Sequence, residues 1–337
     1  MIEDIFIKNG KLDELIEQNL YADAADFLFN SQINKWKFMR ENYAAHKNVK
    51  EKSFWLDECK FKVQFNPARI KSTSADVSEA GLNSRRCFLC AENLPVDQKG
   101  MLLNDNYMIL CNPYPIFPQH FTVSLLEHKS QSIQISIKKL LEITKQLSKK
   151  YTLIYNGPEC GASAPDHLHF QAGTKLLMPI ENDIFQLKNN CGNILLNDGQ
   201  NTLSYIFDGL RTIIFIETLD LDSAVKLFEK FYRGYSKYSN ALNEPMMNIL
   251  CNYDKEFGFG IIVFLRSKHR PKSYYNEEPR KIIVSPAAID LGGIIISPRE
   301  KDFEKLNKEL IQEIISEVSL NSYSFKIFAE NLKDELN

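Results

Sequence analysis

The same succession of secondary-structure elements is predicted twice along this 337-residue chain. In each copy a strand leads to a long amphipathic helix, a second strand, a loop or turn, and a third strand. These elements are predicted at 121–126, 135–150, 151–157 and 167–172 in the first copy, after an extra strand at 107–112, and at 211–217, 221–239, 246–254 and 259–267 in the second. The repeated order indicates an internal duplication. Because antiparallel strands with helices packed on them form such units, we predict an α+β fold.

The segments outside the repeat complete three predicted regions. Apolar residues at helical spacing run from residue 11 to about 46, and further helices are predicted at 299–318 and about 322–335. The predicted regions are a helical N-terminal lead-in at 1–58, a first half at 59–205 and a second half at 206–337.

Charge and composition exclude several classes of partner. The formal net charge is -2, whereas nucleic acids and anionic membranes are bound through a basic excess. The N-terminus carries acidic residues and no basic, apolar leader, and no apolar run reaches the ~18 residues of a membrane helix. We therefore expect a cytoplasmic protein with neither nucleic acid nor membrane as partner. Its 7 cysteines are irregularly spaced, which favours reduced thiols or metal ligands over disulfides.

Polar residues alternate with apolar ones in the stretch 167–172. Side chains at every second position of a strand share one face, so His167, His169 and Gln171 are predicted to point one way and Leu168 and Phe170 the other. A strand face made of two histidines and a glutamine is unusual for a purely structural element. The pattern therefore marks a candidate site.

The chemistry available to this face is attack on phosphorus. A neutral imidazole is a good nucleophile near neutral pH, provided that one tautomer is held and a donor faces the phosphate oxygens. Gln171 is positioned to supply that donor, and the preceding loop offers Gly157, Gly161 and backbone N–H groups for close approach of a phosphate. Two other interpretations of the histidines remain: side chains on a solvated face, or ligands of a metal.

The second copy carries no comparable polar face. Apolar residues, such as Ile261, Val263 and Leu265, are predicted at the positions of the histidines and the glutamine. Directly after this strand lies a cationic cluster made of Arg266, Lys268, His269, Arg270 and Lys272. Arginine suits phosphate oxygens, so Arg266, Lys268 and Arg270 are candidate phosphate ligands; a solvated basic turn is the alternative.

A single CxxC pair is formed by Cys87 and Cys90. Such a pair is redox-active, zinc-binding or neither, depending on its surroundings. No βαβ pattern surrounds it, which disfavours a thioredoxin-like role. Any further metal ligands must come from elsewhere in the chain.

The stretch "NGPECGASAPDHLHFQ" at 156–171 resembles the Asn…Gly-x-Ser…His-x-His-x-Gln signature of the histidine-triad superfamily. The resemblance is to its transferase and phosphorylase branch, which contains galactose-1-phosphate uridylyltransferases, diadenosine tetraphosphate phosphorylases and GDP-hexose phosphorylases. "NPYPIFPQHFTVSLL" at 112–126 is similar to the strand pair of that branch around a proline and a histidine. The similarity extends from Phe61 to Thr174, and beyond Asp208 it is only architectural.

This resemblance implies a duplicated histidine-triad-like fold and a role for each motif residue. His169 would be the nucleophile that becomes nucleotidylated, and Gln171 would bind the transferred phosphate. The resemblance further implies that His167 orients His169, that Asn156 and Ser163 touch the phosphates or the leaving group, and that Asn66 and Arg69 lie by the nucleotide.

It also implies a structural metal. Uridylyltransferases that carry zinc use a CxxC, the histidine of the strand pair and the first histidine of the triad, here Cys87, Cys90, His120 and His167. His128 is a spare candidate ligand, and the related phosphorylases do without the metal. We expect at most one structural zinc ion and no organic cofactor.

Together these features predict a nucleotidyltransferase or phosphorylase. The expected donor is a nucleotide sugar or a dinucleoside polyphosphate, and the expected acceptor is a sugar phosphate or inorganic phosphate. The sequence contains neither a P-loop nor a G-x-G-x-x-G motif, which disfavours P-loop ATP hydrolysis and Rossmann redox chemistry. The alternatives are a non-catalytic nucleotide-binding or sensing protein, and a nucleotide hydrolase, which would normally carry histidine in place of Gln171. The sequence gives no indication of the oligomeric state.

Overall fold

The central element of the chain is a ten-stranded antiparallel sheet. The computed structural model describes residues 2–104, 106–241 and 243–336. In sheet order the strands are β3 (Gly100–Leu103), β4 (Tyr107–Cys111), β5 (His120–Leu125), β7 (His169–Thr174), β6 (Tyr151–Asn156), β11 (Met247–Asp254), β12 (Gly258–Leu265), β10 (Thr212–Thr218), β9 (Asn201–Phe207) and β8 (Gly192–Asn197).

The strand order is the same on both sides of the central β6–β11 pair. Reading outward, β6 is followed by β7, β5, β4 and β3, and β11 by β12, β10, β9 and β8. In each half one helix precedes the central strand: α6 (Ile137–Leu147) before β6 and α8 (Leu221–Ser239) before β11. The predicted α+β class and the duplication are confirmed. The predicted boundary at 205/206 would cut β9, so we propose that the halves meet instead at α7 (Pro179–Cys191), before β8.

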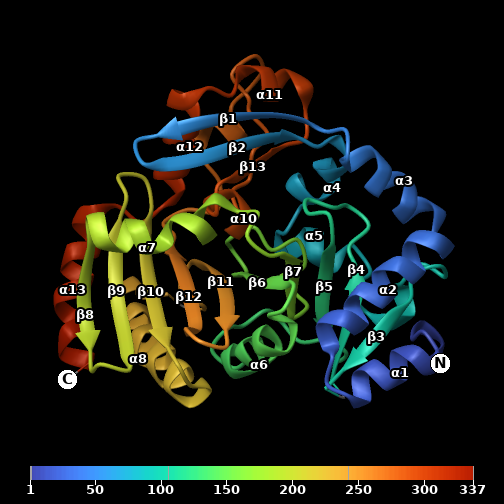
Figure 1. Ribbon diagram of the computed structural model, residues 1–337. Helices are drawn as coiled ribbons and strands as arrows, with labels where there is room; N and C mark the ends of the chain where they lie inside the picture. The colour runs from blue at the N-terminus through green and yellow to red at the C-terminus, as the bar shows by residue number, and fades with distance from the viewer. Residues whose placement is uncertain (1, 105, 242, 337) are drawn as a thin grey trace.

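A second, three-stranded sheet joins a hairpin from the N-terminal part of the chain to a strand from the C-terminal part. Strand β1 (Lys50–Leu56) pairs antiparallel with β2 (Cys59–Phe65), and β2 pairs in parallel with β13 (Ile294–Ser297). Figure 1 shows this sheet across the top of the view, above the central strands. A strand from the second half is thereby fixed beside the segment that follows β2.

The other helices surround the two sheets. They are α1 (Gly10–Glu17), α2 (Tyr21–Lys35), α3 (Lys37–His46), α4 (Ile70–Thr73), α5 (Glu79–Asn83), α9 (Lys272–Tyr275), α10 (Ala288–Leu291), α11 (Glu300–Lys305), α12 (Lys308–Val318) and α13 (Ser322–Leu336), with 3₁₀ turns at η1 (Ile2–Ile5), η2 (Pro67–Arg69) and η3 (Ala91–Asn93). Within the described part of the chain, no helix combines the length and the apolar character that a membrane crossing requires.

Each face of the large sheet has its own hydrophobic core. One face packs against residues of α2, α3, α6, α8 and α13, and the other against residues of the small sheet, α7, α10 and α12. Phe170 and Ala172 belong to the first core. Because side chains alternate along a strand, His169 and Gln171 emerge on the opposite face of β7, toward the small sheet and α10.

The alternation also corrects one expectation about the second half. Ile261, Val263 and Leu265 lie in the core with the long helices, whereas Ile262 and Phe264 lie in the other core. The side chains of β12 that share the sheet face of His169 are therefore Ile262 and Phe264, one position out of phase with the prediction. They are apolar as well, so this face of β12 still carries no nucleophile.

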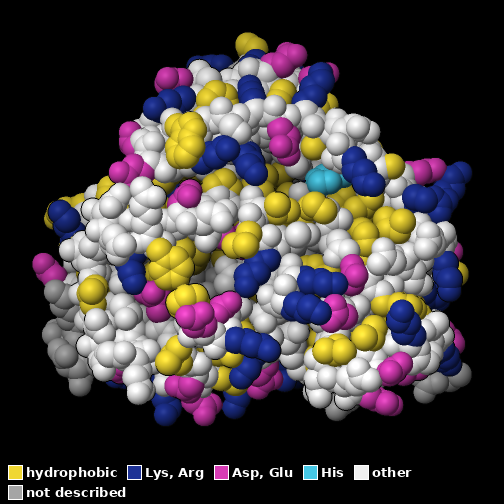
Figure 2. Space-filling model, viewed as in Figure 1, with side chains coloured by type: hydrophobic (Ala, Val, Ile, Leu, Met, Phe, Trp, Pro, Cys, Tyr) yellow, Lys and Arg dark blue, Asp and Glu magenta, His cyan; other side chains and the backbone are white. Residues whose placement is uncertain are grey.

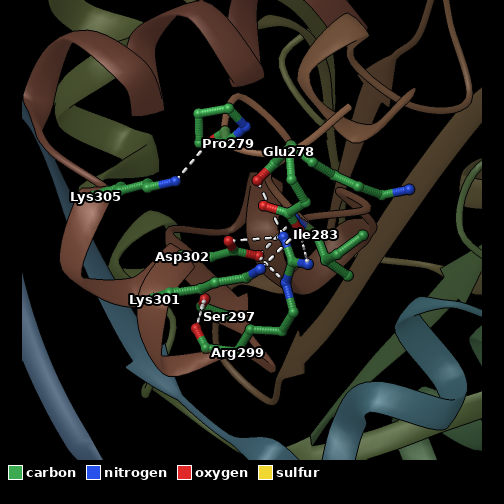
Figure 3. A network of polar contacts seen from close by, with 9 residues as sticks. Glu278, Pro279, Ile283, Ser297, Arg299, Lys301, Asp302 and Lys305 are labelled. Carbon is green, nitrogen blue, oxygen red and sulfur yellow. Dashed lines mark hydrogen bonds and ion pairs between the residues drawn. The ribbon is translucent and has the colours of Figure 1, made fainter. Parts of the chain in front are cut away.

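A polar network anchors the segment that leads into α10. The guanidinium of Arg299 donates to both carboxylate oxygens of Asp302, at 2.7 and 2.8 Å, and to Glu278 at 2.7 Å, while Asp302 also accepts the backbone N–H of Ile283 (Figure 3). Asp302 is fully buried, and such a carboxylate is stabilised when its oxygens are satisfied by a forked donor. The network therefore fixes the course of residues 278–283, just before those that reach the functional site.

Candidate functional site

A small polar cavity lies where the two halves of the chain meet. The first half contributes Arg69, Ser72, Thr73, Ile116, Asn156, Gly161, Ser163 and Gln171 to its wall, and the second half contributes Ser285, Ala287, Ile289, Asp290 and Ile296. Four of the residues predicted from the motif, Asn156, Gly161, Ser163 and Gln171, are thus brought together, with Arg69 beside them.

Gln171 is oriented by the neighbouring strand. His120, on β5, lies diagonally across from it, and its Nε2 donates to Oε1 of Gln171 at 2.8 Å. The other ring nitrogen, Nδ1, accepts the backbone N–H of Ile116 at 3.3 Å, which fixes the tautomer. Burial, helped by nearby Arg69, lowers the pKa of His120 to about 3, so the ring is neutral. With its oxygen held, Gln171 has its Nε2 donors left for the cavity.

Asn156 is held in the same way from the other side. Its Oδ1 accepts two hydrogen bonds, from Nδ2 of Asn248 at 2.8 Å and from the backbone N–H of Ala288 at 2.9 Å. Among the described residues, its Nδ2 meets no protein acceptor. The side-chain amides of Gln171 and Asn156 therefore line the same cavity, with their oxygens hydrogen-bonded to the protein and their N–H donors free. Such a pair of donors suits the binding of an anion.

The loop after Asn156 is shaped by a close contact with the second half. Gly161 has φ +89°, and a Cβ at this position would lie 2.7 Å from Cβ of Ala287. A residue with a side chain would be strained in both respects, so glycine is required here. The contact keeps the loop backbone and Ser163 against the α10 segment.

The two N-terminal candidates occupy different positions. Arg69 lines the cavity and donates to the carbonyl of Tyr114 at 3.0 Å. Burial lowers its pKa to about 10, so it stays cationic at neutral pH. Asn66 is buried and does not line the cavity; its Nδ2 donates to Oε1 of Gln64 and to the carbonyl of Pro115 at 2.9 Å. It thereby holds the loop next to the lining residue Ile116.

His169 is buried on β7, two positions before Gln171 and on the same strand face. Its Nδ1 lies 2.8 Å from the carbonyl oxygen of His167, an acceptor that assigns the proton to Nδ1. The second nitrogen, Nε2, then carries the lone pair and meets no hydrogen-bond donor in the described residues. Burial lowers the pKa of His169 to about 4, which keeps the ring neutral. His169 is not itself among the residues that line the cavity.

His167 lies just before β7, in a bend, rather than on the strand as predicted. Its Nε2 is 2.7 Å from the carbonyl oxygen of Leu125, and its Nδ1 faces Cys87 Sγ at 3.3 Å and Cys90 Sγ at 3.6 Å. The ring therefore points at the CxxC pair, and the link to His169 runs through the His167 backbone carbonyl.

Four side chains around the CxxC could hold a metal ion. The ligand atoms of Cys87, Cys90, His128 and His167 all lie within 4.8 Å of one another. His128 thus occupies the place predicted for His120, because the ring of His120 is turned into the hydrogen bond with Gln171. Sequence reasoning named His128 only as a spare; its position soon after β5 puts it at the same end of the sheet as His167.

The cluster fits a tetrahedral zinc site. Around zinc, with bonds of ~2.3 Å to sulfur and ~2.0 Å to nitrogen, neighbouring ligand atoms are about 3.5 Å apart. Cys90 Sγ is 3.2 Å from His128 Nδ1, and Cys87 Sγ is 3.3 Å from His167 Nδ1. The carbonyl of Leu125 at the far nitrogen of His167 is the kind of partner that orients a ligating histidine. An ion pair of 2.7 Å between Arg85 and Asp166 closes the loop beside the cluster.

The cationic cluster of the second half is divided by the structure. Arg266 is buried, and all its donors are taken by protein acceptors: Val318, Asn248, Pro286, Lys268 and His269. Lys268 is paired with Glu317 at 2.9 Å.

Arg270 approaches the cavity wall. Its Nε donates to Ser285 Oγ and its Nη2 to the carbonyl of Ala75, both at 3.0 Å, while its guanidinium lies over the ring of Tyr274. Of the three predicted phosphate ligands in this cluster, Arg270 alone bonds to a cavity-lining residue.

Sequence reasoning missed two residues of the second half that shape the site: Asp290 lines the cavity, and Asn248 holds the cavity residue Asn156. Asn248 is a single amide within the buried strand "MNILC", and Asp290 is a single carboxylate within the apolar run "AAIDLGG". Burial raises the pKa of Asp290 to about 6, although its oxygens accept two backbone N–H groups. A lone polar residue inside an apolar element is the signal that could have found both.

The face of the molecule drawn in Figure 2 shows no large patch of one charge. Figure 2 shows basic and acidic side chains mixed over the visible face, with apolar groups between them. This distribution fits the formal net charge of -2 and leaves the positive charge at the site local.

Comparison with solved structures identifies the fold. The yeast Ap4A phosphorylase Apa2 superposes with a TM-score of 0.56 at 16% sequence identity, covering 85% of this chain and 97% of that one. Its complex with AMP gives a TM-score of 0.55, again at 16% identity, over 85% of this chain and 96% of that one. A uridylyltransferase mutant gives only 0.42 at 9% identity, over 78% and 94%. No curated protein sequence shows significant similarity to this chain.

The chain therefore has the fold of the yeast Ap4A phosphorylase, in agreement with the resemblance of its motifs to the transferase and phosphorylase branch of the histidine-triad superfamily. Residues 210–337 match the family model "GDPGP1-like, C-terminal domain". Residues 28–174 match the model "Domain of unknown function (DUF4922)". The resemblance of the sequence motifs to this branch is thereby confirmed.

Proposed function

We propose that this chain is a nucleotidyltransferase or phosphorylase that works through a covalent nucleotidyl-His169. The donor is a nucleotide sugar or a dinucleoside polyphosphate, as the diadenosine tetraphosphate named for the yeast enzyme suggests. The acceptor is inorganic phosphate or a sugar phosphate.

One observation carries the proposal. Gln171 and Asn156 line one cavity with their oxygens held by His120, Asn248 and Ala288, so that both amides offer only donors to a bound group. Arg69 adds a positive charge to the same wall. Preorganised donors of this kind stabilise the non-bridging oxygens of a phosphate, on which charge is redistributed during transfer.

His169 supplies the nucleophile in this scheme. Its Nε2 lone pair attacks the phosphorus next to the nucleoside, a nitrogen–phosphorus bond forms, and the phosphate–oxygen bond to the leaving group breaks with its electron pair on the departing oxygen. Nδ1 keeps its proton throughout, held by the carbonyl of His167, which stabilises the positive charge that develops on the ring. An oxygen of the acceptor then attacks the same phosphorus and releases the imidazole.

We further propose that Cys87, Cys90, His128 and His167 hold one structural zinc ion. A closed Cys₂His₂ site contributes folding free energy and takes no part in the chemistry. Its place in this scheme is to fix the backbone of His167, whose carbonyl holds the nucleophile.

A substrate panel tests the proposal. Nucleotide sugars and dinucleoside polyphosphates are each incubated with inorganic phosphate, with a sugar phosphate, or with water alone, and the products are separated by chromatography. We expect turnover that depends on one of the two acceptors. Equal turnover in water alone would indicate a hydrolase, and no product from any donor would favour the non-catalytic nucleotide-binding protein.

A further inference from the structure

The geometry points to Arg266 and Asn248 as positioning residues that set the direction of the Asn156 amide in the cavity. This inference rests on the proposed function, because it names the role of the second half in binding the same phosphates. In this inference Arg266 does not bind phosphate itself, as the sequence predicted, and instead orients a phosphate-binding group through the side-chain amides of Asn248 and Asn156.

Arg266 fixes the orientation of Asn248. A guanidinium has only donors, and its Nη1 donates to Oδ1 of Asn248 at 2.5 Å. Nη1 also donates to the carbonyl of Pro286, and Nε donates to that of Val318. The five N–H groups of Arg266 are all used in this way, so the guanidinium is immobile and Asn248 must turn its oxygen toward it.

Asn248 in turn fixes Asn156. Its two Nδ2 hydrogens go to Oδ1 of Asn156 at 2.8 Å and to the carbonyl of Cys160 at 2.7 Å. Asn156 and Asn248 are direct partners across the central β6–β11 pair, and both are buried. Because Oδ1 of Asn156 is also bound by the N–H of Ala288, the amide cannot flip, and its Nδ2 lies on the cavity side.

The arrangement explains why a buried cation sits in the half without a nucleophile. Among the described residues, no carboxylate forms an ion pair with Arg266, although an unpaired buried charge is costly. Its contacts are all neutral acceptors, and one of them starts a chain of amides that ends at the cavity. Asn248 also holds the carbonyl of Cys160, and with it the Gly161 loop.

A double-mutant cycle tests this role by binding alone. The probes are ADP, GDP, UDP and CDP, titrated by calorimetry into the full chain; the tightest is used throughout. We expect Asn248→Ala to weaken binding by about 10- to 100-fold, as the loss of a well-directed donor to a charged group would. In an Asn156→Ala background the same change should weaken binding several-fold less, since the effect through Asn156 is then absent and only the bond to the Cys160 carbonyl is lost.

Equal weakening in both backgrounds would overturn the inference, because Asn248 would then act independently of Asn156. Failure of all four probes to bind the wild-type chain would overturn it as well. If Asn248→Ala does not fold, the near-isosteric Asn248→Asp takes its place; it still accepts from Arg266 but offers no donor to Asn156.

Arg266→Lys separates direction from charge. Lysine keeps the positive charge but lacks the fork that binds Asn248 and Pro286 together. We expect weakening comparable to that of Asn248→Ala, and wild-type affinity would show that only the charge of Arg266 matters. Binding and nucleotidyl transfer are measured separately. If the double-mutant cycle gives the expected binding result but the wild-type chain transfers no nucleotidyl group, the proposed function is contradicted and the positioning role is not.

Discussion

His120 donates a hydrogen bond of 2.8 Å from Nε2 to Oε1 of Gln171, and through it β5 sets the direction of an amide on β7. Nε2 of His120 carries the proton because Nδ1 accepts a hydrogen bond from the backbone N–H of Ile116. A histidine expected to bind metal thus orients the side chain of the cavity-lining residue Gln171.

The first prediction concerns this bond. His120→Leu removes the donor, so the Gln171 amide can rotate and present its oxygen to a phosphate. We expect kcat/KM to fall by about 10- to 100-fold, the range for losing one directed donor to developing charge. Steady-state kinetics with the substrate found in the panel measure it. In a Gln171→Ala background the same change should have little further effect; full additivity would contradict the link.

The second prediction separates the two candidate metal ligands. His128→Ala should lower the zinc content of protein purified without added metal from about one ion per chain toward zero, because a four-ligand site loses a ligand. His120→Leu is the matched variant and should keep its zinc. Elemental analysis reads both. Loss of metal in the His120 variant alone would restore the ligand set predicted from the sequence.

The third prediction compares two cations of the same turn. Arg270→Ala should raise KM by about tenfold or more, since Arg270 holds the cavity residue Ser285 and the carbonyl of Ala75 beside the cavity residue Thr73. Lys268→Ala is the control, because Lys268 is half-exposed and pairs with Glu317 at 2.9 Å. Its kinetics should stay within about twofold of wild type, as expected for a surface pair. Equal changes in KM for the two variants would mean that the basic turn is a solvated loop that makes no contribution to the cavity.

The fourth prediction is a pH dependence of stability. Burial raises the pKa of Glu244 to about 7, although the N–H of Ile133 and the hydroxyl of Tyr155 donate to it. The folded chain therefore keeps the Glu244 proton up to about pH 7, whereas the unfolded chain releases it near pH 4.5. The contribution of this proton to the free energy of unfolding is full below pH 4.5 and is lost as the pH rises through 7. The side chain of Glu244→Gln is neutral at every pH, so this variant should not lose stability in this way as the pH rises.

Thermal unfolding between pH 5 and 8 measures this effect. The midpoint of Glu244→Gln should rise relative to wild type as the pH increases, by about 1–2 °C for each kcal/mol in a chain of this size. A difference between the two midpoints that does not change with pH would contradict a raised pKa at Glu244.

The strands and long helices of the duplicated unit were predictable because their patterns are local. The helix predicted at 221–239 coincides with α8, and the strand predicted at 151–157 with β6 to within one residue. Apolar periodicity over such lengths depends little on distant contacts. The phase of β12 was not predictable, because both of its faces are apolar.

The site residues that lie within the contiguous motif were predictable from the sequence. Those that reach the site only when the two halves of the chain pack together were not. Gln171, Asn156 and Ser163 were named from one loop and one strand, and all three line the cavity. The contributions of Asn248 and Asp290 depend on how the halves meet, which no local pattern encodes. The exchange of His120 for His128 depends on the direction of a side chain, and sequence spacing leaves that open.

The central claim is that His169 carries the nucleotidyl group. Intact-protein mass spectrometry after brief mixing with the active donor, without acceptor, tests it most directly. The wild-type chain should gain the mass of one nucleoside monophosphate residue, lose it on addition of the acceptor, and carry it on the peptide that contains His169; His169→Gly, folded to the same thermal midpoint, should gain nothing. A nucleotidyl mass on the His169→Gly variant would contradict the account.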